Sequence, residues 1–147
     1  MPFIRSARHI FLTIALAVTA TVGASEDIAN ERSELMKGVR EATKPVGAML
    51  RGDAEFDAAQ VQESLAVYAD ASARLGDLVP AGSEGGEAAP AVWDDPEGFA
   101  AAIEKWQSAV AAAIEANPQD LDSAKPVLGG VLQNCKGCHD NYRIEDE

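Results

Sequence analysis

The feature that most constrains the fold is a helical spacing of apolar residues, which recurs in four stretches of the chain. In each stretch apolar side chains return every three or four residues, the pattern of a helix with one buried face. The stretches cover residues 27–50, 58–78, 96–116 and 121–142. Strand-like alternation and internal repeats are not found. The sequence therefore predicts an all-α fold.

Residues that cap or end helices separate these stretches. Asp57 and Asp95 are predicted N-caps, and Pro96 suits the first position of the third helix. The Asn-Pro pair at 117–118 ends that helix, and residues 80–90, rich in Pro and Gly, form a loop. The short joints favour antiparallel neighbours, so we expect an antiparallel up-and-down four-helix bundle.

Two prolines lie inside the predicted helices. Pro45 is a candidate kink in the first helix. Pro126 would cost about 3 kcal/mol in a helix interior. The fourth helix therefore either bends at Pro126 or begins its regular part near Lys125.

The first 24 residues have the features of a secretory signal peptide. Arg5 and Arg8 give a basic start, and residues 10–22 carry no charge. Small residues before Ser25 predict cleavage after Ala24. The uncharged run is shorter than the roughly 20 apolar residues that span a bilayer. Residues 25–147 then form one domain, which we expect to be free of the membrane.

The formal net charge of the chain is −12 at pH 7. Such a charge opposes binding to nucleic acid or to anionic lipid. It would attract a partner protein with a basic patch, although a solvated acidic surface accounts for the charge equally well. Charge therefore excludes some partners without identifying one.

Cys135, Cys138 and His139 form the motif that carries chemistry. They are the two cysteines of the chain and the one histidine beyond residue 24. Residues three apart on a helix share a face, with Cβ atoms about 5–6 Å apart. Two thiols so placed reach the two vinyl groups of one haem, and the next residue places an imidazole beneath the iron. The spacing predicts covalent attachment of one haem c.

Three other kinds of site use cysteine and histidine at close spacing. A zinc site needs about four ligands, and only a carboxylate such as Asp140 could complete one. A thioredoxin-like redox pair would lie near a βαβ unit, which the pattern does not contain. A structural disulfide would close a two-residue loop and leave His139 unexplained. Haem attachment accounts for all three motif residues.

The group on the opposite face of the haem must come from an upstream helix. No methionine follows His139, and the only methionines beyond residue 24 are Met36 and Met49. Both lie in the first predicted helix. That helix must therefore fold back across the haem if it supplies the distal group.

Four parts of the sequence carry a family resemblance. They are residues 31–37, residues 49–52 with 56–61, residues 82–86 with 92–93, and residues 135–143. In this order and spacing they resemble the cytochrome c′ family of class II c-type cytochromes. The resemblance covers nearly all of residues 25–147. It implies a four-helix bundle enclosing one haem in an exported, periplasmic protein.

The resemblance also implies roles for particular residues. Cys135 and Cys138 would be the thioether anchors, and His139 the axial ligand on the proximal side of the iron. Arg32 matches an arginine placed near a haem propionate, and Arg143 a basic residue beside the proximal histidine. For both arginines a plain solvated surface charge is the alternative.

Met36 matches a bulky apolar residue over the open face of the iron, and it decides the expected function. As an apolar plug it leaves the iron five-coordinate and open to nitric oxide or carbon monoxide. As a thioether ligand it gives a six-coordinate, low-spin electron carrier of the same class. Residues 49–93 resemble the first type more closely, so gas binding is the leading hypothesis.

Other expectations rest on weaker features. A peroxidase-like activity would need a polar acid–base group on the distal side, so we expect no enzyme. The family often forms homodimers through its first two helices, and the apolar stripes leave that state open. Two departures from the family pattern are Pro126 and Leu132, the latter where a glycine is common.

Overall fold

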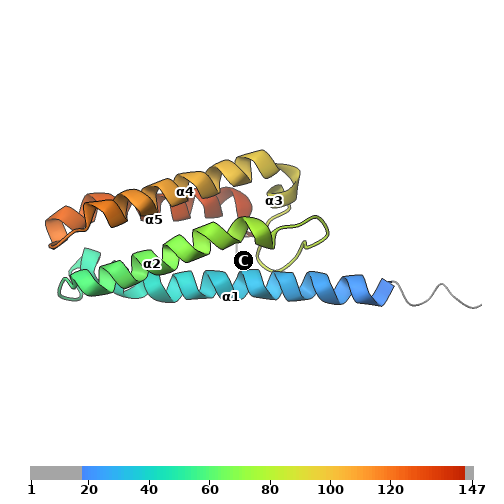
Figure 1. Cartoon of the computed structure of the whole chain (residues 1–147), viewed down its shortest axis with the longest axis horizontal. Coiled ribbons are helices and arrows are strands. Elements are labelled where there is room, and N and C mark those ends of the chain that lie inside the picture. The colour runs from blue at the N-terminus through green and yellow to red at the C-terminus, as the bar shows by residue number, and fades with distance from the viewer. Residues whose placement is uncertain (1–17, 145–147) are drawn as a thin grey trace, which may run out of the picture.

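The computed structural model describes residues 18–144, with side chains from residue 23 onward. Its elements are α1 (Val18–Arg51), α2 (Ala58–Arg74), the 3₁₀ turn η1 (Leu75–Leu78), α3 (Ala91–Asp94), α4 (Pro96–Ala116) and α5 (Leu121–Tyr142). The four long helices form a bundle in which α1 pairs with α2 and α4 with α5 (Figure 1). The predicted all-α, antiparallel four-helix bundle is confirmed.

Three of the four long helices begin at side-chain caps. Asp57 accepts a hydrogen bond from the Gln60 amide at 3.1 Å, and Asp95 accepts one from Gly98 at 3.1 Å. Both N-caps confirm the prediction. Asp120, which the sequence did not single out, forms a capping box with Ser123 at the start of α5. These caps satisfy amides that have no partner inside the helix.

The first predicted helix begins too late. We expected it from residue 27, whereas α1 starts at Val18, because no proline separates the two positions and the single Gly23 does not interrupt the helix. The early part makes little packing contact. From residue 23 onward, the first buried side chain on α1 is Ala29, and the start of the helix projects past the ends of its neighbours (Figure 1). The predicted signal residues 1–17 lie outside the described part of the chain.

The second predicted helix ends too far along, and one helix was missed. We expected a helix to residue 78, but α2 ends at Arg74 and the chain tightens into η1. The predicted loop over 80–90 is confirmed, and Gly82, Gly85 and Gly86 all adopt positive φ within it. The four-residue α3 that follows is too short to show a helical period.

Both internal prolines are accommodated in continuous helices. α1 runs through Pro45 and α5 through Pro126. The expectation that the regular part of α5 begins near Lys125 is therefore wrong. Pro126 leaves the carbonyl of Asp122 without its helical donor, and Asp122 is exposed to water in the first turn.

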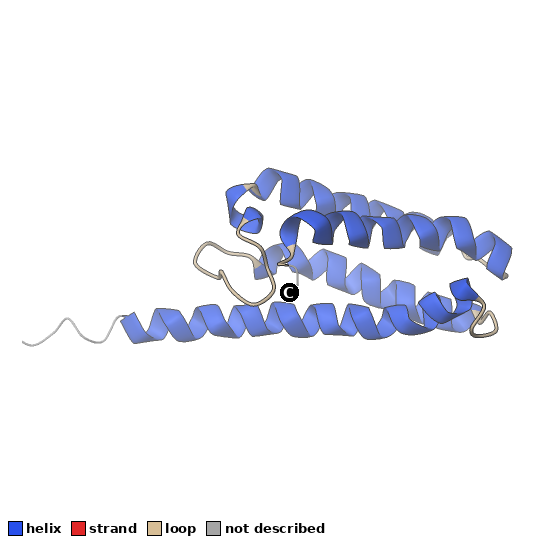
Figure 2. Cartoon of the chain, turned by 180° about the vertical axis from the view of Figure 1, so that it is seen from behind, coloured by secondary structure: helices blue, strands red, loops and turns tan. Residues whose placement is uncertain are grey.

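The helices close tightly at one end of the bundle. There the best-buried side chains are small aliphatic groups from all four long helices, namely Val46, Val61, Leu65, Val110, Ala113, Ala124, Leu128 and Val131. α4 packs extensively on α5 and on α2, and α1 on α2, whereas direct contact between α1 and α5 is slight. Figure 2 shows α1 and α5 from the other side. Within residues 18–144, no helix combines the length and apolar character needed to cross a membrane.

Candidate functional site

A cavity of about 760 Å³ lies between α1 and α5, which make little direct contact with each other. Cofactor pockets usually measure roughly 300–1,000 Å³ and are mainly apolar. The apolar part of this lining comes from α1, η1, the following loop, α4 and α5, and includes Met36, Val39, Leu75, Val79, Val92, Phe99, Ile103, Trp106 and Leu132. The cavity is thus built by three of the four long helices together with η1 and the following loop, and none of its lining residues comes from α2.

The three motif residues line this cavity together from α5. Both thiols are half-buried and unbridged. Burial raises the pKa of Cys135, and the neighbouring Cys138 raises it further; burial also raises the pKa of Cys138. The thiols are therefore protonated at neutral pH, unlike the low-pKa thiols of disulfide oxidoreductases. No disulfide joins them, so that alternative finds no support.

The His139 imidazole also belongs to the cavity wall. Partial burial lowers the pKa of His139, and the positive charge of Arg143 lowers it further, while Glu87 and Asp140 act in the opposite direction. The neutral imidazole that results is the form that binds metals. Across residues 18–144, no three His, Cys, Asp or Glu side chains gather as a metal-binding group. The zinc alternative therefore lacks its further ligands there.

Met36 reaches the cavity from α1, and Met49 does not. Met36 is half-buried in the wall. Met49 is 3 % exposed in the closed end of the bundle, where its Sδ accepts a hydrogen bond from the Asp57 amide at 3.2 Å. Of the methionines within residues 18–144, Met36 is thus the only candidate for a distal group.

Arg32 is buried, so its interpretation as an exposed helix charge is wrong. Its guanidinium donates hydrogen bonds to the carbonyls of Leu78 at 2.6 Å, Ser83 at 3.1 Å and Gly85 at 2.9 Å. It also lies over the Trp93 ring, 5.3 Å from the centroid. Arg32 therefore fastens the loop after η1 to α1 while it contributes to the cavity wall.

Arg143 belongs to a contact that joins the end of α5 to the same loop. Its Nε lies 3.2 Å from Glu87 Oε2, and its backbone pairs with Ala88 in an antiparallel bridge. The Ile144 amide donates to the Glu87 carbonyl at 2.9 Å. The interpretation of Arg143 as a plain solvated charge is therefore wrong. This contact lies one helical turn beyond His139 and steadies the end of α5 that carries it.

Comparison with known proteins identifies the chain. The family model described as "Cytochrome C'" matches residues 27–143. The chain belongs to the cytochrome c′ family. A cytochrome c′ of Rhodopseudomonas palustris is 45 % identical over 125 residues, which cover 83 % of this chain and 85 % of the relative. A cytochrome c-556 of Agrobacterium tumefaciens is 31 % identical over 117 residues, covering 79 % and 94 %.

Solved structures of the family have the same fold. The cytochrome c′ of Rhodopseudomonas palustris superposes with a TM-score of 0.78 at 44 % identity, covering 82 % of this chain and 98 % of that one. A nitric oxide complex of a cytochrome c′ variant from Alcaligenes xylosoxidans superposes with a TM-score of 0.72 at 30 % identity, covering 82 % and 97 %. The resemblance found in the sequence is thereby confirmed.

The cavity fits the covalently attached haem c of cytochrome c′ proteins. Two free thiols with the required spacing and a neutral imidazole share one wall. Trp106 is also a lining residue, and its buried indole Nε1 has no hydrogen-bond partner among the described residues. Such an atom is expected where a bound group supplies the missing contact. Haem c is therefore the cofactor of this family member.

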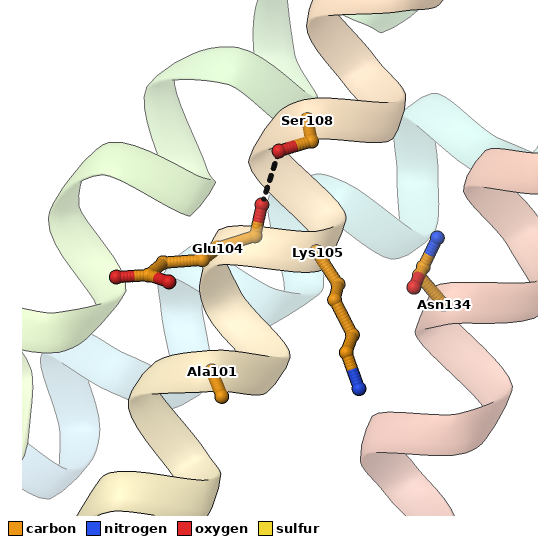
Figure 3. A pocket seen from close by; sticks show the side chains of 5 residues that line it. All are labelled: Ala101, Glu104, Lys105, Ser108 and Asn134. Atoms are coloured by element: carbon orange, nitrogen blue, oxygen red, sulfur yellow. Dashed lines mark hydrogen bonds between the residues drawn. The ribbon is translucent and has the colours of Figure 1, made fainter.

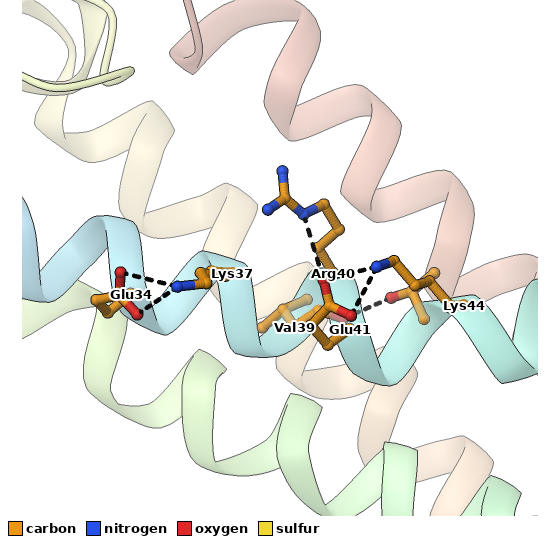
Figure 4. Close-up of polar contacts among 7 residues, drawn as sticks. Glu34, Lys37, Val39, Arg40, Glu41 and Lys44 are labelled. Carbon is orange, nitrogen blue, oxygen red and sulfur yellow. Dashed lines mark hydrogen bonds and ion pairs between the residues drawn. The ribbon is translucent and has the colours of Figure 1, made fainter.

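Six of the basic residues line the cavity, namely Arg32, Lys37, Arg40, Lys44, Arg51 and Arg143. Three of these basic residues on α1, namely Lys37, Arg40 and Lys44, lie close to acidic side chains of the same helix, as Figure 4 shows. Lys37 pairs with Glu34 at 3.2 Å, and Lys44 with Glu41 at 2.6 Å. Cations at this rim suit the anionic carboxylates of a haem.

Sequence reasoning missed two polar features of the cavity. The first is the Trp106 Nε1, which has no hydrogen-bond partner among the described residues; in the sequence, Trp106 is one of the apolar residues of the predicted helix over 96–116. The second is the hydrogen bond between Thr43 Oγ1 and the buried Tyr68 hydroxyl, at 2.9 Å. In both cases the sequence did contain a signal, because a side chain with a polar atom stands among the apolar residues of a predicted helix face.

A second hollow lies on the outer side of α4 and α5 (Figure 3). Its volume is about 450 Å³, and it is open to solvent. Its polar groups satisfy each other locally: Ser108 donates to the Glu104 carbonyl at 2.8 Å, and Asn134 to that of Gly130 at 2.9 Å. It contains no thiol or imidazole, so the chemistry belongs to the first cavity.

Proposed function

We propose that this cytochrome c′ family member is a periplasmic haem protein that binds small gases, nitric oxide or carbon monoxide, at a five-coordinate iron. The observation that carries the proposal is that Met36 from α1 and His139 from α5 line one largely apolar cavity. When bound, the haem supplies an iron that can exchange one electron and hold a diatomic gas at a vacant axial position.

The residues on α5 would hold and orient the cofactor. Cys135 and Cys138 would form the two thioether bonds, and His139 would be the axial ligand on the proximal side. Each thiol would add across one vinyl group, with the sulfur bonding to one vinyl carbon and the S–H hydrogen going to the other, so no atom is lost and no oxidant is needed. Protonated, half-buried thiols next to the cavity suit this chemistry.

The residues on α1 would define the distal side. Met36 and Val39 present apolar surface to the cavity, which excludes water and favours small apolar ligands. His139 is the only histidine within residues 18–144. A peroxidase-like acid–base group is therefore not provided by a second imidazole, and we propose a binding protein rather than an enzyme.

The charged residues would secure the carboxylates and the proximal side. Arg32 lines the cavity in addition to its hydrogen bonds to the loop, so we assign it a contact with a haem propionate. Arg143 would keep a positive charge near His139 and affect the ligands that bind there. A nitric oxide complex of a 30 % identical relative is consistent with a gas-binding role.

The second candidate is a six-coordinate electron carrier with His139 and Met36 as axial ligands. Met36 is the sole cavity methionine within residues 18–144, and one relative of 31 % identity is named cytochrome c-556. Met/His ligation raises the reduction potential of a cytochrome. The two candidates differ in one coordinate bond.

An optical spectrum of the purified protein separates these candidates. The gas-binding proposal expects high-spin ferrous and ferric spectra, and Met36→Leu should leave them high-spin. Met49→Leu is the matched control, since Met49 is buried outside the cavity. A change from low to high spin in Met36→Leu alone would identify Met36 as a ligand and overturn the five-coordinate assignment.

Export is the remaining part of the proposal. Arg5, Arg8 and the uncharged run over 10–22 support a signal peptide cleaved after Ala24. From residue 23 onward, the first buried residue of α1 is Ala29, which lies beyond the proposed cleavage site. Intact mass of the exported protein should equal a chain beginning at Ser25 plus one haem. A retained N-terminus would contradict this cleavage.

Partner proteins follow from the charge and the family. We propose a redox partner with a basic patch, attracted by the acidic surface of a chain with net charge −12. We also propose a homodimer through α1 and α2. Sedimentation at several protein concentrations tests the dimer, and the ionic-strength dependence of electron exchange tests the charge attraction.

A further inference from the structure

The Trp106 indole is a buried hydrogen-bond donor for which the protein provides no acceptor. Trp106 is 7 % exposed, and its Nε1 has no partner within the described chain. The other tryptophan differs: Trp93 Nε1 donates to the Pro80 carbonyl at 3.2 Å. A buried donor left unsatisfied costs free energy, so the group is explained best by an acceptor that enters the cavity.

The surroundings of Trp106 restrict what this acceptor can be. On α4 its neighbours along the buried face are Ile103 and Val110. The cations that line the cavity come from α1 and from the end of α5, and none comes from α4. A carboxylate would be drawn to those cations, whereas an apolar wall with one N–H suits a small neutral acceptor.

Nearby polar groups do not compete for the role. The Tyr68 hydroxyl is already paired with Thr43, and Gln107 donates to the Ser72 carbonyl at 2.9 Å. Both of these donors are satisfied by the protein. Among the buried neutral N–H and O–H groups of the described residues, Trp106 Nε1 is therefore the donor that lacks an acceptor in the protein.

We infer that Trp106 is a specificity-determining residue whose indole N–H donates a hydrogen bond to the oxygen of a diatomic gas held in the cavity. This inference rests on the proposed gas-binding function and adds a polar contact to a pocket that is otherwise apolar. The contact favours gases with an acceptor atom over equally small apolar molecules.

Carbon monoxide bound to the ferrous protein is the probe, since its stretching frequency reports hydrogen bonding to the oxygen. Trp106→Phe keeps an aromatic ring and removes the donor. The C–O stretch should move to higher frequency, and carbon monoxide should bind roughly two- to tenfold more weakly, as expected for one lost hydrogen bond. Trp93→Phe is the matched control, because Trp93 does not line the cavity, and it should change neither quantity.

Several outcomes would overturn the inference. An unchanged C–O stretch in Trp106→Phe with normal haem content rejects it, while bound carbon monoxide still supports the proposed function. An unchanged stretch with altered vibrations of the haem carboxylates assigns the indole to a carboxylate instead. If the wild type binds no carbon monoxide, the proposed function fails, and the same comparison in a Met36→Leu background decides the role of Trp106.

Discussion

The two ends of the bundle are built from the same four helices but are packed differently: side chains fill one end, and the other contains the cavity. At the closed end Val46, Leu65 and Leu128 are at most 1 % exposed. At the cavity end, the helices carry half-buried groups such as Met36 and Cys138 in the corresponding stripes. The closed end is completed by its own side chains, whereas the cavity end needs a bound group to complete it.

This difference teaches that an apolar stripe does not specify what it packs against. Small β-branched and aliphatic residues let helices approach closely. Larger or polar side chains on α1 and α5 keep those helices apart, and the cavity occupies the space. The closed end should therefore carry most of the folding free energy that is independent of haem, and the cavity end most of the chemistry.

The largest expected effect comes from removing both thiols. Cys135→Ser with Cys138→Ser should abolish covalent attachment, because no other cysteine exists in the chain. Intact mass after denaturation should then be that of the bare polypeptide. Lys136→Ala is the control: Lys136 lies between the cysteines and pairs with Asp140 on the outer surface at 2.6 Å. A covalent haem in the double variant would disprove the attachment sites.

The next effect tests the closed end. Leu128 is 1 % exposed and lies on α5, two turns before Cys135. Leu128→Ala should lower the free energy of unfolding by about 2–5 kcal/mol, because it leaves a cavity among packed side chains. Denaturant unfolding followed by circular dichroism measures the loss. The haem spectrum should not change, and a shifted Soret band would contradict the separation of the two ends.

Local sequence predicted the helix boundaries where capping residues mark them. α4 begins and ends at the predicted residues because Asp95, Pro96 and the 117–118 pair act on their immediate neighbours. The predicted start of α1 was wrong because no proline lies between Val18 and residue 27, and the helix continues through Gly23. α3 was missed because four residues show no period.

The candidate site divides in the same way. The Cys135, Cys138 and His139 spacing is local, so the sequence revealed it directly. The loop contacts of Arg32 join residues 46 to 53 positions apart, and no local pattern predicts them. The unpartnered Trp106 Nε1 likewise depends on which residues of other elements line the cavity with it, and no local pattern shows that.

An intermediate effect is expected at Arg32, which borders the cavity end. Arg32→Lys keeps the charge but cannot reproduce the hydrogen bonds to Leu78, Ser83 and Gly85. We expect a loss of about 1–3 kcal/mol, the cost of leaving buried carbonyls unsatisfied. Hydrogen exchange should accelerate in residues 78–86 before it does in α4. Uniform acceleration along the chain would show that Arg32 does not act through this loop.

The smallest effect completes a matched pair on α5. Leu132 lies one turn after Leu128, yet it is only half-buried and lines the cavity. Leu132→Ala should cost about 1 kcal/mol, less than the change at Leu128, because only part of the side chain is removed from water.

The effect on the optical spectrum should be larger for Leu132→Ala than for Leu128→Ala, the reverse of the order expected for the loss of unfolding free energy. Leu132→Ala should shift the Soret band, because it changes the wall of the haem cavity, whereas Leu128→Ala should leave the band in place. The same truncation, one turn apart, thus separates a residue that stabilises the bundle from one that shapes the cofactor environment. Equal unfolding losses together with equal spectra would mean that the two ends are not distinct, and that the haem stabilises the whole bundle as one unit.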